Sequence, residues 1–389
     1  MEKRVLFNQN QTIGGFMEGG YDVYAYQPSQ TNWVRHSLIS APNELKIQWK
    51  VKVPSSLQEC SIVLGRNGEI YFGSLSGDLY CYSSEGELVW KLKLGSELSS
   101  PAIGADQRIY VAAKMNDDSE MSYLYAISSN AIVEWKCELN QLISYPPMLD
   151  SAGNIYVTTY GKQMCCINPD GIIQWTTSTD YLLSCSPVIT SKGHILINEG
   201  GLIHCLNLSG QEVWRKETRA GIGVIPIVLS DASYLTTGSI NENMKLLKLN
   251  SLGECVWAFP EKEDYSLWRS PVISRDGIIY IAGSEYRFQA IDVKSQSLLW
   301  ESRIEGTIGH PPLISNDNKL IIASSGGNIP RDSKKGLVSK MTLLNETGKL
   351  ISEVYLPGEV TSPCLGQGSK VYITTNIPLK NHGYLYCIG

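Results

Sequence analysis

The sequence predicts an all-β fold, an eight-bladed β-propeller built from four-stranded antiparallel blades. A phrase ending in tryptophan recurs about every 40 residues, which is the length of one propeller blade. Each period also contains short runs of β-branched and aromatic residues separated by turns rich in glycine. The chain of 389 residues is long enough for eight such periods.

The recurring tryptophans mark the last strand of each blade. They close phrases such as Gly86-Glu87-Leu88-Val89-Trp90, and the full set is Trp49, Trp90, Trp135, Trp175, Trp214, Trp257 and Trp300. An eighth copy, Gly348-Lys349-Leu350-Ile351-Ser352, has serine in place of tryptophan. We expect each tryptophan to pack between neighbouring blades, because large aromatic side chains contribute much of a repeat interface.

The other strands follow in a constant order within each period. A Ser-Pro strand such as Ser100-Pro101 comes first, and two apolar strands and the tryptophan strand follow it. The chain ends on a third strand, residues 383–389, so the last blade needs a fourth strand from elsewhere. We expect residues 44–51 to supply it, which leaves no sheet edge at the seam of the ring. Residues 1–43 then form an N-terminal arm, and residues 44–389 form the propeller.

Composition narrows the class of protein. The 33 Lys and Arg residues against 38 Asp and Glu residues give a net charge of −5, which argues against a dedicated nucleic-acid binder. No apolar run approaches the ~18 residues of a membrane span. The apolar run Val5-Leu6-Phe7 is too short for a signal peptide, so we expect a cytoplasmic protein. Its ten cysteines are then expected to be reduced thiols.

The repeated phrases resemble the pyrroloquinoline-quinone-like (PQQ-like) repeat family. The resemblance rests on Ser100-Pro101, Arg108-Ile109-Tyr110-Val111, Leu124-Tyr125-Ala126-Ile127 and Trp135, and it covers roughly residues 44–389. The family includes quinoprotein dehydrogenases, a scaffold lipoprotein that helps to assemble outer-membrane barrels, and members without a cofactor. The resemblance therefore implies the propeller fold and leaves the function open.

The family's quinone sites use a disulfide between adjacent cysteines, which draws attention to Cys165-Cys166. The repeat itself explains this pair. Small residues stand nine positions before four of the tryptophans, and the terminal strand places a cysteine at the equivalent position: Cys81, Ala126, Cys166, Cys205 and Cys387. We expect a small buried residue there, since cysteine behaves as a small hydrophobe. No cofactor is expected, and no histidine has metal-ligand spacing with another His or Cys.

Candidate functional residues come from one face of the propeller. Loops that join successive blades, and loops that join second and third strands, lie on the same face, and functional residues usually lie on such loops. The residue two positions before the recurrent proline is expected to ring the channel mouth. Blade by blade these residues are Cys60, Ser99, Tyr145, Cys185, Val224, Arg269, His310 and Thr361. Tyr145, Arg269 and His310 interrupt a ring of small residues, and Trp268 adjoins Arg269.

The loops of this face also differ in charge. Basic residues come from the long insertion of blade 7, residues 325–336, and from the last blade: Arg331, Lys334, Lys335, Lys380 and His382. Acidic residues come from blade 2: Asp117, Asp118 and Glu120. The face is expected to have a basic and an acidic side, unless these charges are only solvated loop tips.

Taken together, these residues favour a cytoplasmic binding or scaffold propeller for a protein partner or a small anionic molecule. Tyr145, Trp268, Arg269 and His310 would hold it, with Cys60 and Cys185 on the same ring. Arginine suits bidentate anion recognition, and histidine can tune it with pH. The alternative is an enzyme, a lyase, isomerase or cyclase, whose active site lies in the central funnel. His310 or Tyr145 would be its acid or base, and Arg269 would stabilise a developing anion. A quinone-dependent dehydrogenase is a third interpretation.

Overall fold

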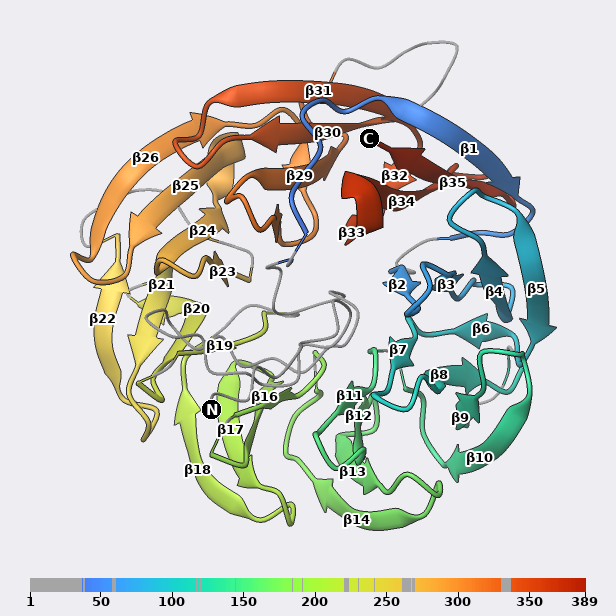
Figure 1. The fold of residues 1–389 in the computed structure, drawn as a ribbon. Coiled ribbons are helices and arrows are strands. Elements are labelled where there is room, and N and C mark those ends of the chain that lie inside the picture. Colours follow the sequence, from blue (N-terminus) through green and yellow to red (C-terminus); the bar gives the residue numbers. More distant parts are fainter. Residues whose placement is uncertain are drawn as a thin grey trace, which may run out of the picture.

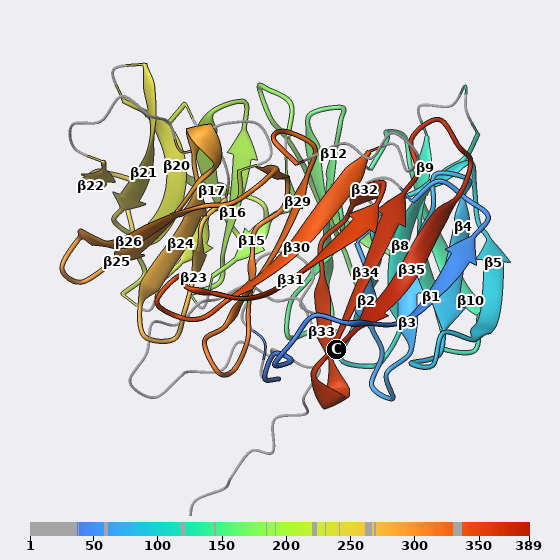
Figure 2. The same ribbon diagram turned by 90° about the horizontal axis from the view of Figure 1, so that it is seen from above.

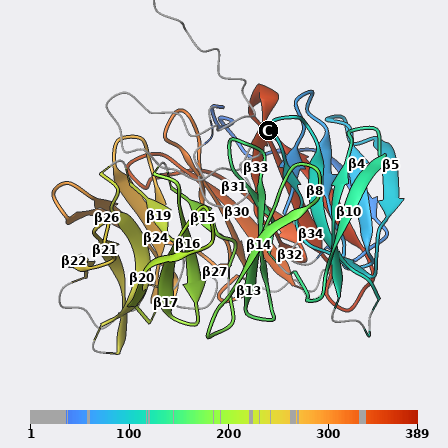
Figure 3. The same cartoon turned by 90° about the horizontal axis from the view of Figure 1, so that it is seen from below.

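Eight antiparallel sheets are arranged as blades around a common centre, which confirms the predicted eight-bladed propeller (Figure 1). The computed structural model describes residues 37, 39–57, 61–116, 118, 121–143, 145–183, 185–190, 192–219, 224–229, 231–240, 242–260, 267, 270–329 and 337–389. Seen edge-on, the propeller is a shallow disc, and its strands run between the two faces of the disc (Figures 2 and 3).

The first four blades follow the chain in order. Blade 1 contains β2 (Val63–Leu64), β3 (Ile70–Phe72), β4 (Asp78–Tyr82) and β5 (Leu88–Lys93). Blade 2 contains β6 (Glu97–Leu98), β7 (Ala102–Ile103), β8 (Ile109–Lys114), β9 (Ser122–Ile127) and β10 (Val133–Leu139). Blade 3 contains β11 (Met148–Leu149), β12 (Ile155–Thr159), β13 (Gln163–Ile167) and β14 (Ile173–Ser178). Blade 4 contains β15 (Val188–Ile189), β16 (His194–Glu199), β17 (Leu202–Asn207) and β18 (Glu212–Glu217).

The remaining blades include the one that closes the ring. Blade 5 contains β19 (Ile227–Val228), β20 (Tyr234–Ile240), β21 (Asn243–Leu249) and β22 (Cys255–Phe259). Blade 6 contains β23 (Val272–Ile273), β24 (Ile278–Ala282), β25 (Arg287–Asp292) and β26 (Ser297–Arg303). Blade 7 contains β27 (Thr307–Ile308), β28 (Leu313–Ile314), β29 (Leu320–Ser325), β30 (Val338–Leu344) and β31 (Leu350–Pro357). Blade 8 contains β32 (Glu359–Val360), β33 (Cys364–Gly366), β34 (Lys370–Asn376), β35 (Gly383–Ile388) and β1 (Ile47–Val53).

Helical structure within the described residues is limited to the short 3₁₀ turns η1 (Ser284–Tyr286) and η2 (Gln367–Ser369). Neither turn has the length or the apolar character that a membrane-spanning helix requires.

The side chains of each blade form rows across its strands. In blade 3, Tyr156 pairs with Cys166, and Cys166 pairs with Trp175. The tyrosine and tryptophan rings lean over the small cysteine, and their centroids lie 6.0 Å apart. The same row is Tyr71–Cys81–Trp90 in blade 1, Tyr110–Ala126–Trp135 in blade 2 and Tyr372–Cys387–Trp49 in blade 8. The expected small residue opposite each tryptophan is therefore a packing requirement, which confirms the structural interpretation of Cys166.

Each regular tryptophan also joins its blade to the next one, as expected. The Trp135 ring N–H donates to the Pro169 carbonyl of blade 3 at 2.9 Å. The turn that presents this carbonyl ends at Gly171, whose φ is +82°. A Cβ at Gly171 would lie 2.7 Å from the Trp135 ring, so only glycine allows this approach. Four further tryptophans donate in the same way: Trp90, Trp175, Trp214 and Trp300.

The ring closes where β1 pairs with β35, with Trp49 opposite Cys387. The closing strand begins at Ile47, later than the predicted residue 44, because the preceding segment is bound to blade 7 (Figure 2). The Ser37 N–H donates to the Ile314 carbonyl at 2.6 Å, and the Leu45 N–H donates to Ser352 Oγ at 2.9 Å. At the tryptophans that donate to the next blade, a hairpin turn of that blade covers the ring. At Ser352 the segment around Leu45 takes the place of that turn, so a tryptophan is not needed.

Candidate functional site

The predicted ring residues differ in exposure. Four of the small ones are buried and take part in structural contacts: Ser99, Cys185, Val224 and Thr361. The Cys185 carbonyl accepts a hydrogen bond from Thr158 Oγ1 at 2.9 Å, and burial raises the pKa of the Cys185 thiol to about 12. Cys185 is therefore a buried structural thiol. Cys60, Trp268 and Arg269 lie outside the described residues, as do Arg331, Lys334 and Lys335 of the blade 7 loop.

Tyr145 and His310 are half-buried, and they lie on opposite sides of the ring. Tyr145 precedes the inner strand of blade 3, and its ring lies 6.3 Å from that of Tyr160 in the same blade. His310 precedes the inner strand of blade 7, four blades further around the ring (Figure 1). The predicted shared site would therefore have to span the whole channel.

Cys165 and Cys166 do not fit the adjacent-cysteine disulfide of a quinone site. Both are free thiols, with 2% and 3% of their surface exposed. They are consecutive residues of β13, so their side chains point to opposite faces of blade 3. Cys166 lies in the row between Tyr156 and Trp175, and Cys165 accepts a hydrogen bond from Thr176 at 3.5 Å. Their position in a paired strand prevents the two sulfur atoms from meeting.

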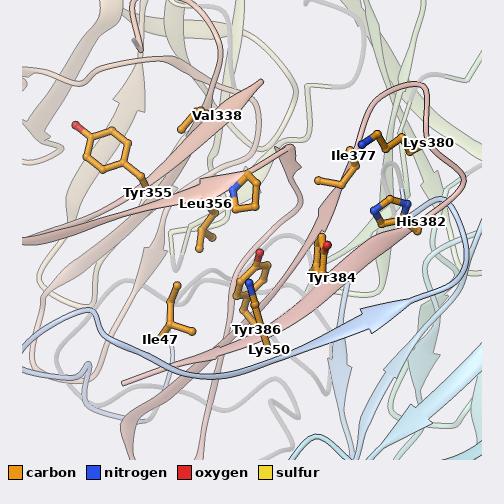
Figure 4. A pocket seen from close by; sticks show the side chains of 11 residues that line it. Ile47, Lys50, Val338, Tyr355, Leu356, Ile377, Lys380, His382, Tyr384 and Tyr386 are labelled. Atoms are coloured by element: carbon orange, nitrogen blue, oxygen red, sulfur yellow. The ribbon is translucent and has the colours of Figure 1, made fainter. Parts of the chain in front are cut away.

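A groove of about 670 Å³ lies at the seam between blades 7 and 8 (Figure 4). We call it the seam groove. Its volume is within the range typical of ligand-binding pockets. It is lined by Val338, Tyr355, Leu356 and Pro357 of blade 7, and by Ile47, Lys50, Ile377, Lys380, His382, Tyr384 and Tyr386 of blade 8. The lining combines aromatic and apolar walls with cations and contains no carboxylate.

Four basic side chains gather on the blade 8 side of the seam groove: Lys50, Lys52, Lys380 and His382. We call them the seam basic cluster. Lys50 Nζ lies 5.6 Å from the centroid of the Tyr384 ring, and the His382 ring meets the same tyrosine edge-on at 5.7 Å. Burial lowers the pKa of His382, and Lys52 and Lys380 lower it further. Within the described part of the chain, none of the four side chains is paired with a carboxylate.

Blade 2 provides an internal comparison for this cluster. Lys136 lies 4.5 Å from the Tyr123 ring centroid there, as Lys50 lies over Tyr384. Opposite Tyr123, however, stands Glu138, whose carboxylate accepts the tyrosine hydroxyl at 2.9 Å. In blade 8 the residue opposite Tyr384 is Lys52. The repeat thus replaces an acidic position by a basic one at the seam, and a surface that is neutralised in blade 2 carries unneutralised positive charge in blade 8.

A second charged cluster, in blade 4, is structural. Buried His204 lies between two glutamates, 3.1 Å from Glu199 Oε2 and 3.0 Å from Glu212 Oε2. The other oxygen of Glu199 accepts the backbone N–H groups of Asp180 and Tyr181. The cluster therefore ties the loop between blades 3 and 4 to the strands of blade 4. Among the described residues, no group of three His, Cys, Asp or Glu side chains is arranged to hold a metal ion.

Comparisons with known proteins agree with this architecture. The model of the family described as outer membrane protein assembly factor BamB matches residues 35–145 and 132–342, well over half of the chain. A protein of Bacillus subtilis (strain 168), named uncharacterized protein YxaL, is 23% identical over 205 residues. That match covers 42% of this chain and 50% of YxaL, so the chain matches half the length of that relative.

Solved structures with the same fold belong to proteins of different activity. BamB from Moraxella catarrhalis superposes with a TM-score of 0.59 and 14% identity, covering 88% of this chain and 99% of that one. Quinohemoprotein alcohol dehydrogenase from Comamonas testosteroni superposes with a TM-score of 0.62 and 10% identity, covering 91% of this chain and 78% of that one. The quinohemoprotein alcohol dehydrogenase ADHIIG from Pseudomonas putida HK5 superposes with a TM-score of 0.64 and 11% identity, covering 91% of this chain and 78% of that one. At these identities the similarity shows the fold alone.

Proposed function

The chain belongs to the family of the outer membrane protein assembly factor BamB, with a PQQ-like repeat β-propeller, and from this premise we propose that it is a binding or scaffold propeller for an anionic partner. The observation that carries the proposal is the seam basic cluster, three lysines and a titratable histidine without a carboxylate partner in the described residues. Long basic side chains that surround an aromatic ring offer an anion both charge and hydrogen-bond donors. The family's description as an assembly factor supports a role in binding other proteins.

Reversal of charge in the seam basic cluster is expected to abolish most of this binding. A ten-residue oligoglutamate peptide, titrated calorimetrically at low salt, is the probe. The double variant Lys52→Glu, Lys380→Glu should bind it at least about tenfold more weakly, since each surface ion pair contributes on the order of 1 kcal/mol and reversal adds repulsion. Lys136→Glu, a charge reversal in blade 2 at the position equivalent to Lys50, should bind like the wild type. Equal affinity of all three proteins would reject the proposed site.

The same binding is expected to strengthen as the pH falls from 7.5 to 6. Burial, Lys52 and Lys380 lower the pKa of His382, so its imidazole is neutral at pH 7.5 in the free protein. A bound anion favours the imidazolium and raises that pKa, so binding takes up a proton and the affinity rises as the pH falls. The glutamates stay ionised across this range. In His382→Asn the pH dependence should vanish. An unchanged slope in that variant would show that His382 does not face the anion.

The ring of Tyr145, Trp268, Arg269 and His310 stays a prediction, because half of it lies outside the described residues. The cytoplasmic location and the enzymatic alternative also stay predictions.

A further inference from the structure

We infer that the anionic partner is an extended acidic peptide segment that places an aromatic side chain in the seam groove. This inference rests on the proposed binding function and adds the kind of partner and its orientation along the seam. Three properties of the groove carry it: its length, the separation of charge from apolar surface along it, and the missing hydrogen bond between Tyr386 and blade 7.

The seam groove is long and narrow enough for an extended chain. Its lining reaches from Ile47, which pairs with Ile388, to His382, which precedes the pair Gly383–Val53. At ~3.3 Å per strand residue, this part of β1 and β35 is about 20 Å long. An extended segment of about six residues spans that length. A compact small molecule would cover only part of it.

Charge and apolar surface are separated along the groove. Lys52, Lys380 and His382 gather at the end near the β34–β35 loop. Ile47, 43% exposed, lies at the opposite end. Between them, Tyr355 of β31 lines the blade 7 side of the groove and Tyr384 of β35 lines the blade 8 side (Figure 4). This order fits a segment with carboxylates at one end and an aromatic ring further along, between Tyr384 and Ile47, because tyrosine faces and a lysine beside them favour a further ring.

One hydrogen bond between blades that is present in blade 2 is missing at the seam groove. In blade 2 the Tyr125 hydroxyl donates to the Leu94 carbonyl of blade 1 at 3.3 Å, which ties the two blades together. The equivalent residues at the seam are Tyr386 and Leu356. The buried Tyr386 hydroxyl has no hydrogen-bond partner there. Burial raises the pKa of Tyr386 to about 12, and the nearby Thr375 hydroxyl lowers it. Neither hydroxyl has a hydrogen bond of normal geometry. Leu356 and Tyr386 still pack in one apolar core shared by blades 7 and 8, so the seam keeps this contact and lacks only the hydrogen bond.

Three unlabelled ten-residue peptides, titrated calorimetrically into the full-length protein, test the inference. The first contains glutamates and one tryptophan, the second has alanine in place of the tryptophan, and the third has glutamines in place of the glutamates. We expect the first peptide to bind about tenfold more tightly than either of the others, because only it satisfies both parts of the groove. Ile47→Ser should weaken the first peptide about fivefold and leave the second unchanged. Val133→Ser replaces an apolar residue by serine at the matched, similarly exposed position of blade 2. It should leave the binding of both peptides unchanged.

The possible results separate the two proposals. Equal binding of the tryptophan and alanine peptides would overturn the groove inference and leave the proposed binding of anions intact. Equal binding of the glutamate and glutamine versions would overturn the role of the seam basic cluster. If no acidic peptide binds, both proposals fail. A loss of the tryptophan effect in Ile47→Ser, with an unchanged melting temperature, supports the groove.

Discussion

Replacement of Trp135 by alanine is expected to lower the free energy of unfolding by about 3–5 kcal/mol. The ring packs 5.9 Å from Tyr110 of its own blade and donates its N–H to Pro169 of the next. Its loss leaves a cavity on blade 2 and removes one of the two donors to the Pro169 carbonyl, the other being Arg108 Nη1 at 3.1 Å. The interface between neighbouring blades supplies much of the stability of a repeat protein, so the loss should spread to both blades. Chemical denaturation followed by circular dichroism measures the effect.

Two matched variants separate the contributions of this side chain. Trp135→Phe keeps an aromatic ring and loses the hydrogen bond, so it should cost less, about 1–2 kcal/mol. Trp257→Ala removes a tryptophan that forms no hydrogen bond to the next blade among the described residues, although it packs against Phe259. It should cost less than Trp135→Ala. Equal losses at the two positions would show that the contact between blades is not what the tryptophans contribute.

Replacement of His204 by alanine should also destabilise the protein strongly, by about 3–5 kcal/mol. Glu199 has no exposed surface, and His204 is its side-chain partner. Without the imidazole, a buried carboxylate keeps only the two backbone N–H groups of the neighbouring loop. Removing one partner of a buried polar pair leaves the other without its hydrogen bond and costs more than removing both.

The control for this prediction removes a histidine from the same sheet. His194 lies at the start of β16, and His194→Ala should change the unfolding free energy by less than about 0.5 kcal/mol. The double variant His204→Ala, Glu199→Gln should recover part of the loss, because the charge is gone as well. A His204→Ala protein as stable as His194→Ala would contradict the structural interpretation of the cluster.

The register of the propeller could be predicted from the sequence because one residue type repeats. Once the tryptophans are aligned, the residue opposite each of them follows, and the structure pairs Cys81, Cys166 and Cys387 with Trp90, Trp175 and Trp49. It also pairs Lys248 with Trp257, nine residues apart, and Ala290 with Trp300, ten residues apart. A one-residue longer turn before Trp300 accounts for the difference.

The seam groove could not be predicted in the same way. It is built from residues 47–50, 338–357 and 377–386, which only ring closure brings together. Lys380 and His382 were visible as a basic loop, whereas Lys50 and Lys52 look like ordinary exposed strand residues. Three residues after the tryptophan, blade 2 has Glu138 and blade 8 has Lys52, but blade 1 has Lys93 and blade 6 has Arg303, so this position does not mark the seam. The spacing that predicts a ring around the channel does not indicate that Ser99, Cys185, Val224 and Thr361 are buried and held by hydrogen bonds within a blade or to the preceding one.

Hydrogen exchange of the full-length protein, with and without the acidic tryptophan peptide, tests the central claim most directly. If an anionic peptide binds in the seam groove, backbone amides of residues 377–386 and of β31 should exchange more slowly in its presence. The matched hairpin of blade 2, β9 and β10, should be unaffected. Protection confined to other blades, or none at the seam under saturating peptide, would contradict the account.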